Sequence, residues 1–395
     1  MKRLIHYLSI DNIGVLELLF ASYCILSGYS WGIVKGNLLF LFIMAIMAYI
    51  RKGKSVVKMK ELTWLVIFVA IHEFVLAMVI NAPGYMINNT VSILISCILI
   101  YPIVRALNIE KLLGALNLVG IISIIGIVYH YIIIRNGGTV SPIPLPFMPG
   151  LDTASRLYEE GNRPTSFYWE PAAFVTYMMV PLFLALRNKK FIWSMVIIVS
   201  MFLSTSTTGI TMSLFMLVCY LFTQKINIKY KALIVVITGA FIWSLFYTDL
   251  FSAGMDKMAQ TDIESTSRTI NGPSMVFNMP LNHIIMGMPA ANPYDYFMSG
   301  GFYSSDIIVK DGSIYCSTIW LVLAKYGIVG MMLFLWLYIK PMKVTREITP
   351  FILVLFVSMF FQSFTIGTSG FAFQIIFIYV FINAHKQRQL GRIIE

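Results

Sequence analysis

Charged residues are scarce in this chain of 395 residues: they make up 12% of it, whereas apolar residues make up 58%. A typical soluble domain has about 25% charged and about 45–50% apolar residues. A water-soluble fold of this length cannot bury so much apolar surface, and a disordered chain has the opposite composition. The composition therefore excludes both classes and indicates a membrane protein.

Cysteine is also rare, and its four residues form no CxxC or Cys/His pattern. Three of them lie inside apolar runs, where a small buried side chain is the ordinary expectation. Because no spacing is typical of a metal site, we predict neither a metal nor another cofactor. The sequence also has no repeat of 20–50 residues and no low-complexity tract.

Apolar runs of about 20 residues, the length that crosses a bilayer, recur from end to end. They predict one all-α polytopic membrane domain over 1–395. The first run contains Glu17 and lacks a small-residue cleavage site, so we expect a retained helix and not a signal peptide. The twelve predicted spans are about 12–29, 31–50, 62–80, 88–105, 113–134, 167–186, 191–205, 208–224, 232–250, 314–339, 348–366 and 369–385.

The net charge of +11 follows the predicted topology and does not indicate a nucleic-acid partner. The connections on one side of the membrane, with both termini, hold 21 of the 29 lysines and arginines. Basic residues concentrate on the cytoplasmic side of membrane proteins. We therefore expect both termini in the cytoplasm.

Only two connections are long, about 135–166 and 251–313, and both fall on the predicted outer side. Together they hold nine of the 18 acidic residues. Long ordered loops in compact proteins usually carry function. We therefore expect the functional site at the outer membrane face.

The first candidate site is the stretch RPTSFYWEPAAF, residues 163–174. Pro171 suits the first turn of a helix, which places Glu170 at the N-cap, where the helix dipole favours an anion. One interpretation is that Glu170 only caps the helix and that Arg163 is only a loop charge. The other is that both act on a ligand at the membrane surface.

The second candidate site is the stretch 265–288, which contains Arg268 and His283. A lone loop arginine is usually solvated, and a lone histidine is usually structural. A guanidinium group is always charged, however, and binds phosphate through two parallel hydrogen bonds. Arg163 and Arg268, from two separate outer loops, would together clamp a diphosphate at the bilayer surface.

Three further features remain. Lys325 interrupts an apolar run, so either that helix tilts and the lysine reaches the interface, or the helix breaks near Gly327 and Gly330, which we favour. The hydroxyl-rich stretch 204–209, on the predicted outer side, is either a further candidate site or only a tight helical hairpin, which is the more ordinary interpretation. Charged or titratable side chains within spans usually pair inside the bundle or serve function; we expect structural pairing for Glu17, His72 and Glu73.

These segments resemble the O-antigen polymerase and O-antigen ligase superfamily of bacterial membrane glycosyltransferases, which have the helical GT-C type of fold. Three motifs carry the resemblance, and the hydroxyl-rich turn at 204–209 and the layout of twelve spans with two large outer loops add to it. The motif residues are Arg163, Phe167, Glu170 and Pro171; Arg268, Pro280, Leu281 and Gly287; and Gly327, Ile328 and Gly330.

One departure from the family pattern favours polymerase over ligase. The ligase branch has a histidine eleven residues before the first glycine of the closing motif, and this chain has Cys316 there, followed by Ser317. A transporter or flippase of lipid-linked oligosaccharides is the alternative from another class. It would need charges at the middle of the membrane and short loops, and this chain shows mostly the reverse.

The resemblance implies a metal-independent polymerase of undecaprenyl-diphosphate-linked repeat units at the outer face of the bacterial inner membrane. Its partners would be a lipid-linked glycan donor, a lipid-linked acceptor, the bilayer and a chain-length regulator. Arg163 and Arg268, with His283 as a further candidate, would bind the diphosphate. Glu170 or Asp311 would accept the proton of the attacking hydroxyl.

Overall fold

The computed structural model describes residues 13–26, 29–31, 34–51, 57–79, 83–145, 162–224, 227, 229, 231, 236, 239–240, 267–290, 292–299, 307–309, 314–363 and 366–394. Most of the predicted span 232–250 lies outside these residues, as does Asp311. The regular structure of the described part consists of fourteen α-helices, one short 3-10 helix and one hairpin of two-residue strands.

The elements run as follows: α2 (Val15–Leu26), β1 (Ser30–Trp31), β2 (Val34–Lys35), α3 (Gly36–Arg51), α4 (Lys60–Val79), α5 (Pro83–Ala106), α6 (Ile109–Arg135), α8 (Pro171–Arg187), α9 (Phe191–Leu203), α10 (Thr207–Thr223), α13 (Ser267–Asn278), α14 (Leu281–Met286), α15 (Pro293–Ser299), α16 (Thr318–Val344), η3 (Arg346–Ile348), α17 (Thr349–Ser358) and α18 (Ser369–Ile394). The two strands pair antiparallel.

The predicted helical fold is confirmed, and eleven of the twelve predicted spans contain an α-helix. By length and composition, α4, α6 and α16 are able to cross a membrane, and six shorter apolar helices accompany them. The ten residues of α17 rise about 15 Å, half of a hydrocarbon core of about 30 Å. The twelve crossings and the GT-C type of fold therefore stay predictions.

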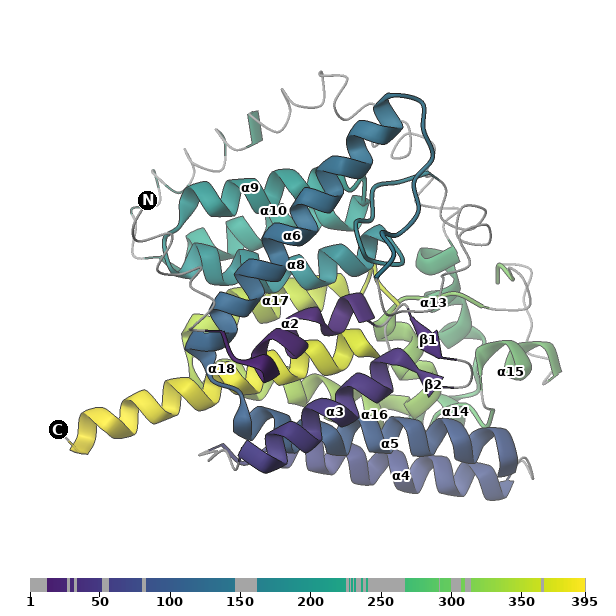
Figure 1. The fold of residues 1–395 in the computed structure, drawn as a ribbon. Helices are drawn as coiled ribbons and strands as arrows, with labels where there is room; N and C mark the ends of the chain where they lie inside the picture. Colours follow the sequence, from purple (N-terminus) through teal and green to yellow (C-terminus); the bar gives the residue numbers. More distant parts are fainter. Residues whose placement is uncertain are drawn as a thin grey trace.

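The bundle has two ends of different character (Figure 1). At the end that we call the basic end, the last turns of α8, α10 and α16 surround the first turn of α6. At the opposite end, the loop end, lie the β1–β2 hairpin, α13, α14 and α15. The two described flanks of the first long connection also meet, because the Ile143 amide donates a hydrogen bond to the Ser166 carbonyl over 2.9 Å.

The first half of α18 forms the centre of the bundle, since every residue from Phe371 to Ile382 is buried. Phe373 stacks on Phe20 of α2, with ring centroids 4.9 Å apart. One turn later Phe377 packs edge-on against Phe351 of α17, with centroids 5.1 Å apart. The rest of α18 extends away from the bundle at the basic end (Figure 1).

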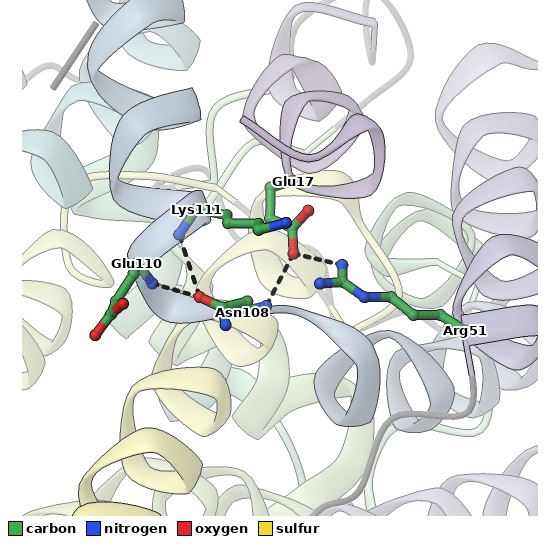
Figure 2. A network of polar contacts seen from close by, with 5 residues as sticks. All are labelled: Glu17, Arg51, Asn108, Glu110 and Lys111. Carbon is green, nitrogen blue, oxygen red and sulfur yellow. Dashed lines mark hydrogen bonds and ion pairs between the residues drawn. The ribbon is translucent and has the colours of Figure 1, made fainter. Parts of the chain in front are cut away.

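Glu17 is fully buried in the first turn of α2 and pairs with Arg51 at the end of α3, 2.6 Å away. The same oxygen accepts the amide hydrogen bond of Asn108, and Asn108 in turn caps α6 through the amides of Glu110 and Lys111 (Figure 2). A buried carboxylate is stable only when it is paired in this way. The predicted structural pairing of Glu17 is confirmed.

Two more ion pairs join α4 to α16. Glu61 pairs with Lys340, and Glu73 pairs with Lys325 at 3.1 Å. Lys325 therefore points at a buried carboxylate and not at the interface. The helix breaks two residues later, as predicted, at Gly327, whose φ of 66° and ψ of −173° are not helical.

The second long connection is more ordered than the sequence indicates, because it contains α13, α14 and α15. These helices enclose a small core of their own and pack it against the first turns of α16. Its buried members are Met275, Met279, Met288, Ala290, Tyr296, Phe297, Ile307, Ile314, Cys316 and Ala324. Periodicity misses this unit because its helices are short and two of them contain proline.

Candidate functional site

The segment 162–170 is anchored into the loop end through its buried residues. The Thr165 amide donates to Nδ1 of His130 over 3.3 Å, and the Tyr168 hydroxyl lies 3.1 Å from that of Ser123. Thr165, Ser166 and Tyr168 are all fully buried. Arg163 and Glu170, the two predicted site residues, are only half-buried. Arg163 and Glu170 are therefore partly accessible at the loop end, whereas Pro171 of the same motif is buried.

Glu170 occupies the N-cap position of α8, as the sequence predicts, with an extended backbone and Pro171 in the first turn. Its carboxylate makes no capping hydrogen bond to that turn. The interpretation that Glu170 serves only as a cap is therefore weakened. A carboxylate at a helix N-terminus also lies in the positive end of the helix dipole, which stabilises its charged form.

Arg268 lies in the first turn of α13. One turn later the fully buried Asn271 holds α13 in place: its amide nitrogen donates to the carbonyls of Ile308 and Tyr315 over 2.8 and 2.9 Å, and its oxygen accepts from the Ile308 amide at 2.7 Å. Asn271 thus ties both described flanks of Asp311 to the helix of Arg268. These contacts join Asn271 to residues that lie 37 and 44 positions away in the sequence, so only the spatial structure reveals them.

His283, predicted as a further diphosphate ligand, lies in α14 and bonds to the hydroxyl of Tyr296 in α15 over 2.7 Å. The rings also meet edge to face, with centroids 5.6 Å apart. Burial raises the pKa of Tyr296 to about 12, so its hydroxyl stays protonated at neutral pH. The contact gives His283 a structural role, and its role toward a diphosphate stays a prediction.

Two glycines of the family motifs meet where α14 crosses the break in α16. Gly287 and Gly327 both have positive φ, 95° and 66°. A Cβ atom at Gly287 would lie 2.7 Å from Nε2 of His72, and one at Gly327 would meet the Ile285 carbonyl. The amide of Met288 donates to the Ala324 carbonyl over 2.8 Å. The second long connection is therefore fastened to α16 by a close backbone crossing that only glycine permits.

The stretch 204–209 is the tight hairpin that the sequence predicts, with Thr205 at a φ of 53° and Ser206 capping α10 through the Gly209 amide. Buried polar atoms gather in this part of the molecule. Gln362, which follows α17, accepts at its carbonyl from both the amide and the hydroxyl of Thr318, at 2.8 and 2.9 Å. Nothing in the sequence pattern singles out Gln362.

Several buried polar groups at the loop end have no hydrogen-bond partner among the described residues. Native proteins rarely leave such groups unpaired, so a water molecule or another polar group is the expected partner of each. The atoms are the hydroxyl oxygens of Thr165, Ser166, Thr205 and Ser317 and the amide nitrogen of Gln362. Glu170 and this set of buried polar groups form the candidate site.

The described residues contain no group of three or more His, Cys, Asp or Glu side chains placed to hold a metal ion. The four cysteines are all buried, and none of them forms a disulfide. Cys316, where the ligase branch has histidine, is 1% exposed and belongs to the core of the second connection. It therefore offers no group to a ligand.

A large cavity lies at the basic end and not at the candidate site. Its volume is about 1600 Å³. The ends of α6, α8, α10 and α16 line it. The cavity and the candidate site lie at opposite ends of the bundle.

No family model matches this chain, and no curated protein sequence matches it. The resemblance to the O-antigen polymerase and ligase superfamily therefore stays a prediction that depends on the motif residues.

Proposed function

We propose that the protein polymerises undecaprenyl-diphosphate-linked oligosaccharide repeat units at the outer face of the bacterial inner membrane. The observation that carries the proposal is the placement of Glu170, a half-buried carboxylate at the mouth of α8 that makes no capping hydrogen bond. It follows Arg163 by seven residues and shares the loop end with buried, unpaired hydroxyl groups.

In the proposed reaction, a hydroxyl of the acceptor sugar attacks the anomeric carbon of the donor glycan. The new glycosidic C–O bond forms as the bond to the diphosphate oxygen breaks, and undecaprenyl diphosphate leaves with the electron pair. The hydroxyl proton passes to a carboxylate, Glu170 or Asp311. A positioned base of this kind contributes a factor of about 10²–10⁴ to the rate.

The proposed task of the two arginines is to bind the diphosphate that leaves. A diphosphate is a good leaving group, so fixed cations at its oxygens would stabilise the charge that develops as the bond breaks. Arg163 and Arg268 are the proposed cations, and no metal is required. Asn271 would act by positioning, because it fixes the helix that carries Arg268.

The burial of Cys316 supports polymerase over ligase, since that position has no base to offer. A transporter of the same lipid-linked substrate is the second candidate, and the large basic cavity is the observation that favours it.

Deletion of the gene in the source bacterium distinguishes among polymerase, ligase and transporter activity. Loss of a polymerase leaves a surface glycan of single repeat units, whereas loss of a ligase or a flippase leaves none. We expect single repeat units in the deletion strain and full-length polymer after complementation. A strain with no surface glycan at all would contradict the proposal.

A further inference from the structure

The cavity at the basic end combines a cationic rim with an apolar wall. Its volume of about 1600 Å³ exceeds the roughly 300–1,000 Å³ of ordinary small-molecule pockets. Seven basic side chains line it, against two acidic ones, Glu110 and Glu347. The reaction proposed above takes place at the other end of the bundle and does not use it.

Some of the basic side chains that line the cavity are not neutralised by ion pairs. Arg187 is neutralised by Glu347 at 2.8 Å, and Arg388 lies 3.8 Å from Glu110. In contrast, Lys189, Lys343 and Arg346 have no ion pair among the residues that the structure describes. The cavity therefore has a net positive charge that is not compensated within the described fold.

Helix ends add to the preference for an anion. The first turns of α6 and α17 border the cavity, at Asn108–Lys111 and at Thr349. Lys190, at the N-cap of α9, also lines it and makes no side-chain capping bond to that helix. The N-terminal ends of helices carry partial positive charge and bind phosphate oxygens.

The wall of the cavity indicates which kind of anion fits. Leu113, Leu184, Ile339 and Met342 line it from three different helices, α6, α8 and α16. Phe222, at the end of α10, also lines it and is 59% exposed. A free phosphate would gain nothing from these apolar surfaces, whereas a phospholipid would place its headgroup on the basic rim and its upper acyl chains on the wall.

We propose that this cavity binds the phosphodiester headgroup of an anionic phospholipid from the leaflet that faces the basic end. By the predicted topology this is the cytoplasmic leaflet, whose anionic lipids attract basic segments by about 1 kcal/mol per residue. The proposal does not depend on the proposed enzymatic activity, and its test measures binding alone.

The test is native mass spectrometry of the full chain, purified in detergent and mixed with equal amounts of phosphatidylglycerol and phosphatidylethanolamine. We expect selective retention of phosphatidylglycerol. In the variant Lys343→Gln/Arg346→Gln its affinity falls about thirty-fold, because each lysine or arginine contributes about a factor of five. Both residues are exposed, so the fold should persist.

The matched control is Lys58→Gln/Lys60→Gln, which removes two exposed basic residues that do not line the cavity. It should keep wild-type affinity. Equal retention of both lipids, or wild-type affinity in the cavity variant, would overturn the proposal. Two further samples contain inorganic diphosphate or undecaprenyl phosphate in place of phosphatidylglycerol; tighter binding of either would also overturn it and assign the cavity to that ligand.

Discussion

At the scale of single residues, Glu170 is the side chain on which the proposed chemistry depends. An ordinary N-cap satisfies the free amides of the first turn, and its loss destabilises by about 0.5–2 kcal/mol. Glu170 occupies that position without the hydrogen bond. Its substitution should therefore affect a reaction more than the fold.

We predict that Glu170→Gln lowers polymerisation by about 10²–10⁴-fold, because the amide keeps the size of the side chain but cannot accept a proton. Thermal unfolding of the purified variant should match that of the wild type. The measurement is the length distribution of the surface glycan in a complemented deletion strain. Wild-type lengths would show that no base is needed at Glu170, and Asp311 would be examined next.

We also predict that Arg268→Lys fails to restore full activity. Lysine keeps the charge but loses the planar fork that binds phosphate through two bonds. Because one hydrogen bond to a charged group contributes about 1.5–3 kcal/mol, the rate should fall about tenfold or more. Arg135→Lys, an exposed arginine at the same end that bonds to Tyr131, is the control. If both variants give wild-type polymer, Arg268 is a bystander.

At the scale of elements, the break in α16 decides where the second long connection is held. Gly327 adopts a φ of 66° with a ψ of −173°, a conformation found almost only in glycine, and the carbonyl of Ile285 lies against it. The close crossing of α14 over α16 therefore depends on the absence of a side chain at this position.

We predict that Gly327→Ala destabilises the protein by about 1–3 kcal/mol through the backbone alone, with the clash adding to this. Gly391→Ala is the matched control, since Gly391 is exposed in α18 with nothing within 4 Å of the added Cβ. In that helix alanine should be neutral or stabilise by about 0.5–1 kcal/mol. Thermal unfolding in detergent tests both, and equal midpoints would refute the role of Gly327.

The same element shows what the sequence could predict and what it could not. The position of the break followed from Lys325 and the nearby glycines, because a charge inside an apolar run must be accommodated. Its partner, Glu73, lies on another helix, and no local pattern identified the pair. Asn271 and Gln362 were missed for the same reason, since their bonds join segments far apart in the chain.

At the scale of the whole molecule, the two ends of the bundle have different proposed functions. The basic end holds the cationic cavity that we propose binds a phospholipid, and the loop end holds the proposed catalytic residues. Helix positions were predictable because apolar length and flanking charge are local properties. The basic cavity was not, because it arises only where the ends of four helices meet. The candidate site lies between these cases: Glu170 at its N-cap and the hydroxyl-rich stretch 204–209 were predicted, whereas the burial of the hydroxyl groups of Thr165, Ser166 and Ser317 was not.

The orientation of this bundle is open to a direct test by thiol labelling. Asn136 lies exposed at the loop end after α6, and Gln389 lies exposed in the last part of α18. In intact spheroplasts we predict that a membrane-impermeant reagent labels Asn136→Cys but not Gln389→Cys, and inverted vesicles should reverse the result. The four native cysteines are buried and give little background. The opposite labelling pattern would show that the predicted orientation of the protein in the membrane is inverted.

The central claim, that this chain is itself a polymerase, is tested most directly by the purified protein in mixed detergent micelles with the lipid-linked repeat unit. Micelles have no compartments, so transport cannot contribute to the product. We predict that glycans of two and more repeat units form as undecaprenyl diphosphate is released, without added metal, and that the Glu170→Gln variant forms almost none. A repeat unit that stays unextended with the folded wild-type protein would contradict the account.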